Sequence, residues 1–301
     1  MKKLFVILSL ALAVAPGLMA QGKKAANNDY LPREGDFAVS VNAVPVFSFI
    51  GNMFNGAAGN GVNGFAGQAY LNNDVASPAF GALNPLVSVS VKYLFTDAIA
   101  LRLNAGWLYS NLTTNAYSQD DAAVFADPLS NAKVIDSRKQ ISNGVSVMVA
   151  PEFRVGRGRV QGVFGAGLLY ACQTGRQLYT YGNKMSAENQ TPSKAFGNAA
   201  APAGFTSARL KDSKNAGCMN YGGLVCFLGV EWFVAPSISL GGEVNVAAVY
   251  RWGGSQYSTV EGFNTLTSQV EEWTDLTAPD SHGFQFGTGN IGANLNLTFY
   301  F

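Results

Sequence analysis

The sequence predicts an all-β protein, an eight-stranded antiparallel up-and-down barrel that crosses a membrane with its strands. Three observations lead to this fold class. Eight stretches alternate apolar and polar residues with a period of two, which gives a strand one apolar and one polar face. Short turns and long polar segments alternate strictly between these stretches. The first twenty residues have the composition of an export signal.

The N-terminal segment, residues 1–20, is expected to be a cleaved secretory signal peptide. Lys2 and Lys3 precede an apolar run that is too short to cross a membrane as a helix, and small residues follow it. Residues 21–35 are polar and are expected to form a loose periplasmic leader. Removing Lys2 and Lys3 leaves 18 of the 20 basic residues against 19 acidic ones, a balance that does not favour nucleic acid.

The barrel is expected over residues 36–301, and its first strand over 36–50. Pro45 lacks a backbone donor, so it marks a bulge or the outer end of that strand. The next two strands, 86–95 and 99–109, form the clearest hairpin of the sequence. Alternation is unbroken in both, and only a short turn separates them.

Two more hairpins and a final strand complete the count of eight. Their strands are predicted over 145–155 and 160–170, 221–234 and 238–252, and 284–301. Gly287 and Gly289 predict a bulge in the final strand. Four long loops join the hairpins, at about 51–83, 111–138, 173–217 and 253–283. These loops are expected to have no regular structure.

The outward faces of the strands favour a membrane barrel over a soluble one. A lipocalin-like barrel would also alternate, but it would not need aromatic and β-branched residues outside on every strand. Aromatic residues near the strand ends match the two interfacial girdles of a membrane barrel. Loop aromatics leave a sugar-binding role open: Tyr179, Tyr181, Tyr257 and Trp273.

The terminal sequence L-N-L-T-F-Y-F, with Phe299 and Phe301, resembles the assembly signal of bacterial outer-membrane barrels. That resemblance implies the barrel-assembly machinery as a partner. The architecture of the whole mature chain resembles the OmpA/OmpX-like family of eight-stranded barrels. The segments 35–40 and 47–55 resemble those of Bacteroidota-type outer-membrane proteins. Because nothing follows the last strand, no peptidoglycan-binding domain is expected.

Charged residues with inward parity are expected to fill the barrel. They are Lys92, Arg102, Glu152, Arg154, Arg159, Glu231, Glu243 and Arg251. An eight-stranded barrel is only wide enough for side chains, so these charges should pair in an ion-pair network and plug it. The alternative is a gated pore or a proton path.

The three cysteines allow at most one disulfide. Cys172 ends the fifth predicted strand and Cys218 precedes the sixth, so the two bracket the longest loop and could bond in an oxidising compartment. The strand register needed to decide this is not given by the sequence. Cys226 is expected to face lipid as a small apolar residue.

No catalytic, cofactor-binding or metal-binding residues are predicted. The single histidine, His282, lies in Asp280-Ser281-His282-Gly283, but neighbours in one turn seldom reach triad geometry. The acidic residues Asp120, Asp121, Glu271, Glu272, Asp275 and Asp280 could hold a cation that bridges lipopolysaccharide. Their spacing fits no EF-hand, so a solvated loop is the preferred interpretation.

The sequence therefore predicts a non-enzymatic protein of the bacterial outer membrane. Its role is expected to be structural or in surface interaction, carried by the long loops. Two alternatives remain: an accessory subunit of a secretion or envelope complex, and a small-solute porin. The expected partners are outer-membrane lipid, lipopolysaccharide and a protein bound by the loops or the periplasmic turns.

Overall fold

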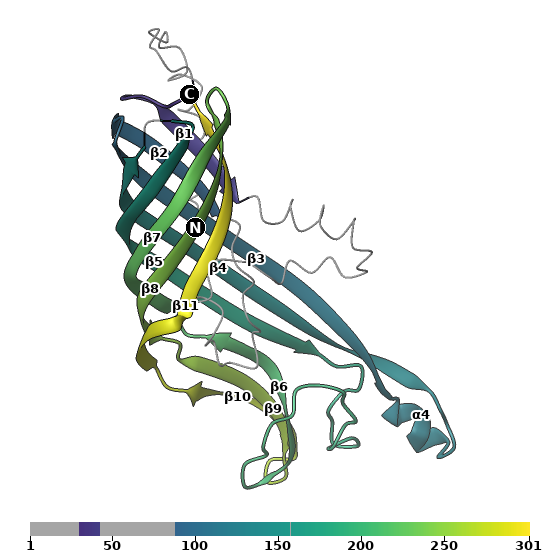
Figure 1. The fold of residues 1–301 in the computed structure, drawn as a ribbon. Helices are drawn as coiled ribbons and strands as arrows, with labels where there is room; N and C mark the ends of the chain where they lie inside the picture. The colour runs from purple at the N-terminus through teal and green to yellow at the C-terminus, as the bar shows by residue number, and fades with distance from the viewer. Residues whose placement is uncertain (1–29, 43–87, 157) are drawn as a thin grey trace.

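The computed structural model describes residues 30–42, 88–156 and 158–301 (Figure 1). The predicted signal peptide, most of the leader, Pro45 and the loop 51–83 lie outside these residues. The elements in chain order are β1 Phe37–Asn42, β2 Ser88–Thr96, β3 Ile99–Gln119, α4 Asp121–Ala126, β4 Lys133–Val155, β5 Val160–Thr180, β6 Phe205–Asn215, β7 Met219–Ala235, β8 Ile238–Gly253, β9 Gln256–Asn264, β10 Gln269–Ala278 and β11 Ser281–Tyr300. The predicted all-β antiparallel class is confirmed.

Strand pairing among the described residues runs round a closed circuit. Following the pairs from β1 leads through β2, β3, β4, β5, β7, β8 and β11 and back to β1, and every pair is antiparallel. We call these eight strands the ring. The circuit leaves none of them with an unpaired edge at the level where all eight meet.

The ring reverses the usual placement of apolar and charged side chains. In β3, Leu101 and Leu103 are 40% and 43% exposed on the outside, whereas Arg102 between them is 3% exposed on the inside. Strand geometry explains this alternation, because successive side chains point to opposite faces. The same alternation holds in β7, where Leu224 and Leu228 are exposed and Val225 and Phe227 are buried.

Two buried apolar clusters fill the inside of the ring beside the charged groups. The first contains Met148, Ala150, Leu169, Ala171, Met219, Tyr221, Val225, Phe227, Ala247 and Val249. The second, near the chain terminus, contains Ala38, Leu94, Ala100, Phe233 and Tyr300, with Tyr30 and Leu31 packed against it. The end of the leader is therefore held against the ring, and Glu34 N–H donates to Asp97 Oδ1 at 2.9 Å.

Three of the predicted loops contain strands. β3 and β4 stay paired from Tyr109–Asn143 to Gln119–Lys133, so the predicted loop 111–138 continues the hairpin and ends in the short helix α4. β6 lies within the predicted loop 173–217, and β9 and β10 lie within 253–283. These strands are rich in Thr, Ser and Asn and lack a regular apolar–polar alternation, but backbone pairing still extends the ladder.

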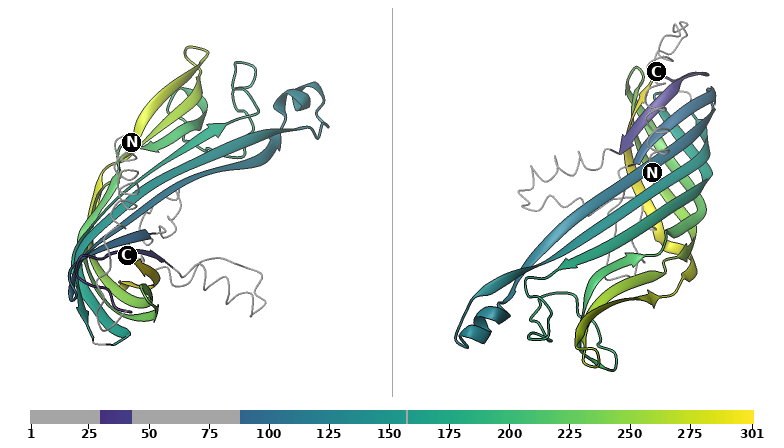
Figure 2. Two further views of the ribbon diagram at one scale, coloured as in Figure 1. Left: turned by 90° about the horizontal axis from the view of Figure 1, so that it is seen from above. Right: turned by 180° about the vertical axis from the view of Figure 1, so that it is seen from behind.

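The strands beyond the ring form a second region of sheet. Figure 2 shows β3, β4 and β5 reaching past the ring as a curved sheet, which β6, β9 and β10 continue in that order from the edge of β5. We call residues 111–141, 174–217 and 254–280 the extension.

The irregularity predicted near Gly287 is confirmed, because the β11–β8 register shifts between Phe286 and Ile291. The described residues contain no helix of sufficient length and apolarity to cross a membrane.

Candidate functional site

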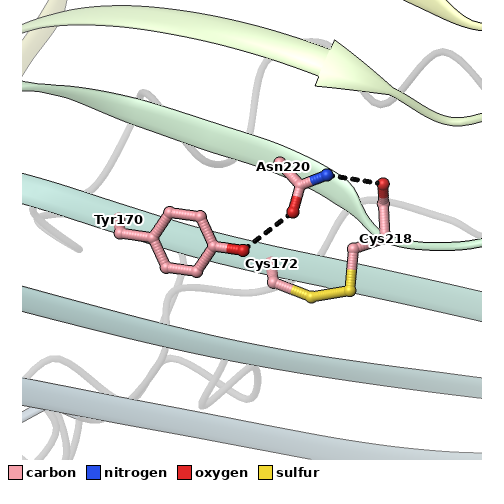
Figure 3. The surroundings of a disulfide bond; sticks show 4 residues. All are labelled: Tyr170, Cys172, Cys218 and Asn220. Atoms are coloured by element: carbon pink, nitrogen blue, oxygen red, sulfur yellow. Dashed lines mark hydrogen bonds between the residues drawn. A yellow bond between two sulfur atoms is a disulfide. The ribbon is translucent and has the colours of Figure 1, made fainter.

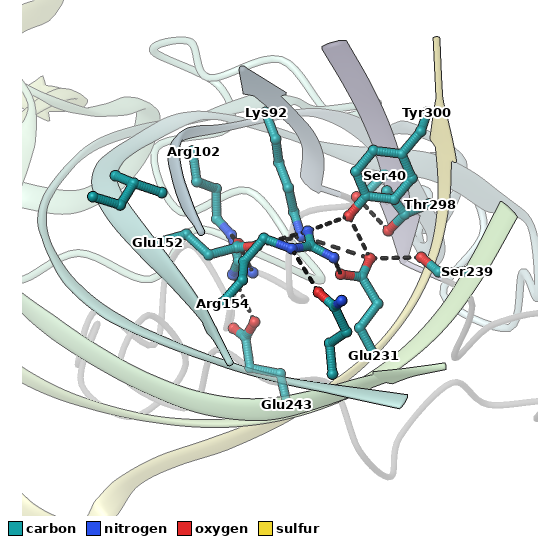
Figure 4. Close-up of polar contacts among 12 residues, drawn as sticks. Ser40, Lys92, Arg102, Glu152, Arg154, Glu231, Ser239, Glu243, Thr298 and Tyr300 are labelled. Carbon is teal, nitrogen blue, oxygen red and sulfur yellow. Dashed lines mark hydrogen bonds and ion pairs between the residues drawn. The ribbon is translucent and has the colours of Figure 1, made fainter. Parts of the chain in front are cut away.

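Six charged side chains from five strands meet inside the ring (Figure 4). Three are cations and three are anions, so their formal charges balance. We call this group the interior cluster: Lys92 on β2, Arg102 on β3, Glu152 and Arg154 on β4, Glu231 on β7 and Glu243 on β8. Each is less than 10% exposed. Charges removed from water in this way require partners, because an unpaired buried ion is costly.

Glu152 is the centre of one half of the interior cluster. Its Oε1 accepts a hydrogen bond from Lys92 Nζ at 3.0 Å, and its Oε2 accepts one from Arg102 Nε at 2.8 Å. Arg102 reaches across the ring with its other nitrogen, and Nη1 donates to Glu243 Oε2 at 2.6 Å. The Arg102 guanidinium also lies 4.2 Å from the centroid of the Phe227 ring. These contacts connect β2, β3, β4 and β8 through side chains alone.

Arg154 and Glu231 form the other half. Arg154 Nη1 donates to Tyr300 Oη at 2.6 Å, and Tyr300 O–H donates to Glu231 Oε1 at 2.7 Å. Ser239 Oγ donates to the same Glu231 oxygen at 2.5 Å. Arg154 Nη2 and Glu231 Oε2 are 2.8 Å apart as an ion pair without hydrogen-bond alignment. The terminal strand is thus tied to β4 and β7 through Tyr300.

Two residues expected in the ion-pair network are not among the six members of the interior cluster. Arg159 is exposed in the turn between β4 and β5, where its guanidinium lies 3.6 Å from the centroid of the Tyr30 ring. Strand alternation was expected to turn the Arg159 side chain inward. Arg159 precedes the first residue of β5, so this alternation does not extend to it. Arg251 has inward parity on β8 but is partly exposed near the extension, opposite Tyr221 and Gly283.

Tyr300 and Ser239 are members of the site that the sequence analysis missed. Phe299 and Phe301 are 37% and 48% exposed on the outside of the ring, so strand alternation turns Tyr300 inward. The alternation of the terminal sequence, with Tyr300 between Phe299 and Phe301, is the signal that could have identified it. Nothing in the sequence around Ser239 indicates that it contacts a buried carboxylate.

A disulfide joins Cys172 and Cys218 at the boundary between the ring and the extension (Figure 3). β5 pairs with β7 up to Gln173 and with β6 from Arg176 onward, so the bond lies where β5 changes partner. Tyr170 O–H donates to Asn220 Oδ1 at 2.8 Å, and Asn220 Nδ2 donates to the Cys218 carbonyl at 3.0 Å. Cys226 is free and exposed.

Within the extension, buried polar groups hold the segment 181–204 on β4 and β6. Asp136 is fully buried and accepts hydrogen bonds from Gly182 N–H at 2.9 Å and Ala195 N–H at 2.8 Å. Arg209 donates to Glu261 Oε1 at 2.6 Å, and its guanidinium lies 4.2 Å from the Tyr181 ring centroid. Burial raises the pKa of Tyr181, so its hydroxyl stays protonated and donates to the Leu210 carbonyl at 2.5 Å.

Asp121 ties the same segment to the start of α4. Its Oδ2 accepts hydrogen bonds from Asn189 Nδ2 at 2.7 Å and from Ser193 N–H at 2.8 Å. Partial burial acts to raise the pKa of Asp121, but these hydrogen bonds outweigh it and hold the pKa below its ordinary value. The carboxylate is therefore the form that fits this fold.

The remaining candidates form no reactive arrangement. His282 lies near the start of β11 opposite Trp252, and the centroids of its ring and the Tyr250 ring are 6.5 Å apart. Among the described residues, no group of three or more His, Cys, Asp or Glu side chains is arranged to hold a metal ion. Trp273 packs against Phe205, with ring centroids 4.8 Å apart.

No protein-family model and no curated protein sequence matches this chain. Similar solved structures include outer membrane protein OprG from Pseudomonas aeruginosa, with 12% identity and a TM-score of 0.31. They also include a major outer membrane protein from Thermus thermophilus, with 11% identity and a TM-score of 0.34, and Outer Membrane Protein W from E. coli, with 12% identity and a TM-score of 0.26. The matches cover 90%, 89% and 89% of this chain and 98%, 99% and 99% of those chains.

Proposed function

We propose that the ring is an eight-stranded transmembrane barrel of a bacterial outer membrane and that the chain is a non-enzymatic surface-interaction protein. The observation that carries the proposal is the closed circuit of strands with aliphatic side chains outside and charges inside. An exposed sheet edge would leave backbone groups unpaired in lipid, and closure removes it.

The outward side chains support a lipid environment. Leu168, Leu228 and Val244 are 69%, 67% and 55% exposed on three different strands, and many other aliphatic residues accompany them. In water this area would be unfavourable at roughly 25 cal/mol per Å² of apolar surface. In a bilayer the same surface is the expected lipid-facing band.

The interior supports a plugged barrel rather than a pore. An eight-stranded barrel has room for side chains only. Here the interior cluster joins β3 to β8 through the Arg102–Glu243 contact of 2.6 Å, which spans the lumen. A conducting pathway would have to break buried ion pairs, so a small-solute porin is the weaker candidate.

The extension supports a role at the cell surface. It is folded by its own buried groups, such as Asp136 and Arg209, and is not a set of loose loops. A binding surface benefits from a rigid scaffold because less conformational entropy is lost on association. An outer-membrane lipid, lipopolysaccharide or protein partner would meet this region first. An accessory role in an envelope complex is the second candidate, and the barrel-assembly machinery would act on the terminal strand.

The test is heat-modifiable gel mobility of the folded protein together with single-channel conductance in planar bilayers. We expect a faster-migrating unheated band and no steady conductance. Absence of the fast-migrating band would overturn the proposal that the ring is a membrane barrel. The fast band together with steady conductance would overturn the proposal that the interior cluster plugs the barrel, and would favour the small-solute porin. Deleting residues 256–278, which form β9 and β10, should abolish binding of a surface partner and leave the fast band intact.

A further inference from the structure

We propose that Lys139, Arg176 and Lys214 form a site for the phosphate groups of outer-leaflet lipid headgroups. We call these three residues the basic patch. The inference rests on the proposed function, because it requires that the ring span a lipid layer with the extension outside it.

Strand register places the basic patch on one face of the sheet. Arg176 on β5 lies opposite Ile141 on β4 and opposite Lys214 on β6. Lys139 is two residues from Ile141 and therefore shares its face. Directly paired residues point to the same side of a sheet and neighbouring strands are about 4.8 Å apart, so the three cations are near neighbours.

That face is the continuation of the outside of the ring. The β4–β5 register runs from Val147–Tyr170 to Lys139–Leu178 without a shift. Val147 and Tyr170 are exposed on the outside of the ring, so Lys139 and Arg176 lie on the same side further along. The basic patch faces whatever medium surrounds the ring at that height and does not face the lumen.

The position along the strands matches the headgroup layer. Tyr109, which is 54% exposed, pairs with Asn143, and Asn143 pairs with Thr174. Arg176 is the next residue on the same face of β5. Tyr257 lies opposite Lys214 on β9. Aromatic side chains mark the membrane interface, and basic residues beside them extend toward lipid phosphates.

The charges of the basic patch are largely available. Arg176 forms a forked contact with Asp212, with Nε at 2.9 Å and Nη2 at 2.6 Å from its oxygens, which leaves Nη1 outside the fork. Within the described part of the chain, the side chains of Lys139 and Lys214 take part in no hydrogen bond or ion pair. The three cations of the basic patch are therefore accompanied by one paired carboxylate, that of Asp212, on an open face. An open surface spread over three strands fits a layer of headgroups better than a single enclosed ion.

The experiment compares lipid binding by full-length protein, refolded in detergent and analysed by native mass spectrometry. The probe is diphosphorylated lipid A, with dephosphorylated lipid A as its reference. The variant Lys139→Gln/Lys214→Gln should bind diphosphorylated lipid A roughly 30-fold more weakly than the wild type, and its binding to the dephosphorylated probe should not change. The variant Lys133→Gln/Lys184→Gln is the control, because it removes the same charge from exposed positions of the extension outside the basic patch.

Unchanged affinity of the patch variant would overturn the proposal, and so would an equal loss in both variants, which would reflect net charge. Displacement of lipid A by inorganic phosphate at equal concentration would also overturn it in favour of a free-anion site. Heat-modifiable mobility is measured on all three proteins. If the wild type lacks the fast-migrating band, the proposed membrane barrel is wrong. If all three proteins show the fast band and the patch variant binds lipid A as the wild type does, only the proposed phosphate site is wrong.

Discussion

The interior cluster of the ring and the Lys211–Glu272 pair of the extension place charged residues in opposite environments. In the ring, Glu152 is fully buried and bonded to Lys92 and Arg102. In the extension, Lys211 pairs with Glu272 while the two side chains remain 39% and 51% exposed. A buried ion that loses its partner keeps its desolvation penalty, whereas an exposed one is solvated by water. The same residue types are therefore expected to contribute much more to stability in the interior cluster than in this exposed pair.

The sharpest test of this contrast is Glu152→Gln. The substitution preserves size but leaves three interior cations facing two anions, and Arg102 and Lys92 lose a charged acceptor. We expect a loss of roughly 3–5 kcal/mol in the free energy of unfolding. The measurement is urea unfolding in detergent, followed by the disappearance of the fast-migrating band. A change below about 1 kcal/mol would mean that the interior cluster does not stabilise the ring.

The disulfide at the junction tests how firmly the two regions are joined. Cys172 and Cys218 are separated by 46 residues, so breaking their bond releases a long closed segment of the unfolded chain. The variant Cys172→Ser/Cys218→Ser should lose about 2–4 kcal/mol and become sensitive to protease within 173–217. Cys226→Ser is the matched control, because that thiol is free and exposed. Equal protease resistance of both variants would show that β6 is held by strand pairing alone.

Acid should loosen the segment 181–204 of the extension. The pKa of Asp121 is lowered by its hydrogen bonds to Asn189 and Ser193, so the stabilisation is present above the ordinary Asp value of about 4 and is lost as the pH falls through the lowered pKa. Amide hydrogen exchange in 181–204, corrected for its intrinsic pH dependence, should rise in acid. Asp121→Asn should show the faster exchange at neutral pH and no further acid response. A wild-type profile that stays flat below a pH of about 4 would contradict this role.

Alternation predicted the ring well because one of its faces must be apolar. Leu101, Leu103 and Arg102 follow that rule, and the strands β2, β3, β5, β7 and β8 were found at nearly their observed positions within the ring. The extension was missed because strands such as 111–119 and 133–141 have polar residues on both faces. Their pairing depends on backbone hydrogen bonds, which have no residue pattern.

The interior cluster was predictable only in part, for a related reason. Parity tells which way a side chain points, so Glu152, Arg154 and Glu231 could be assigned to the interior. It does not tell where a strand begins, and Arg159 falls one residue outside β5. The contacts of Tyr300 with Arg154 and Glu231 depend on how the terminal strand pairs with β1 and β8, and β1 lies at the opposite end of the sequence.

The smallest effect is expected for Glu272→Gln, the same substitution as in the ring but in the exposed pair with Lys211. The lysine can return to water or approach Glu261, whose Oε2 is 3.8 Å away. We expect a loss below about 1 kcal/mol that shrinks further as salt is raised, because exposed charges are screened. The readout is the same urea titration, at low and at high salt, beside Glu152→Gln. If Glu272→Gln were as destabilising as Glu152→Gln, burial would not be the property that separates the interior cluster from the exposed pair. The contrast would then have to lie in the network of contacts around each carboxylate.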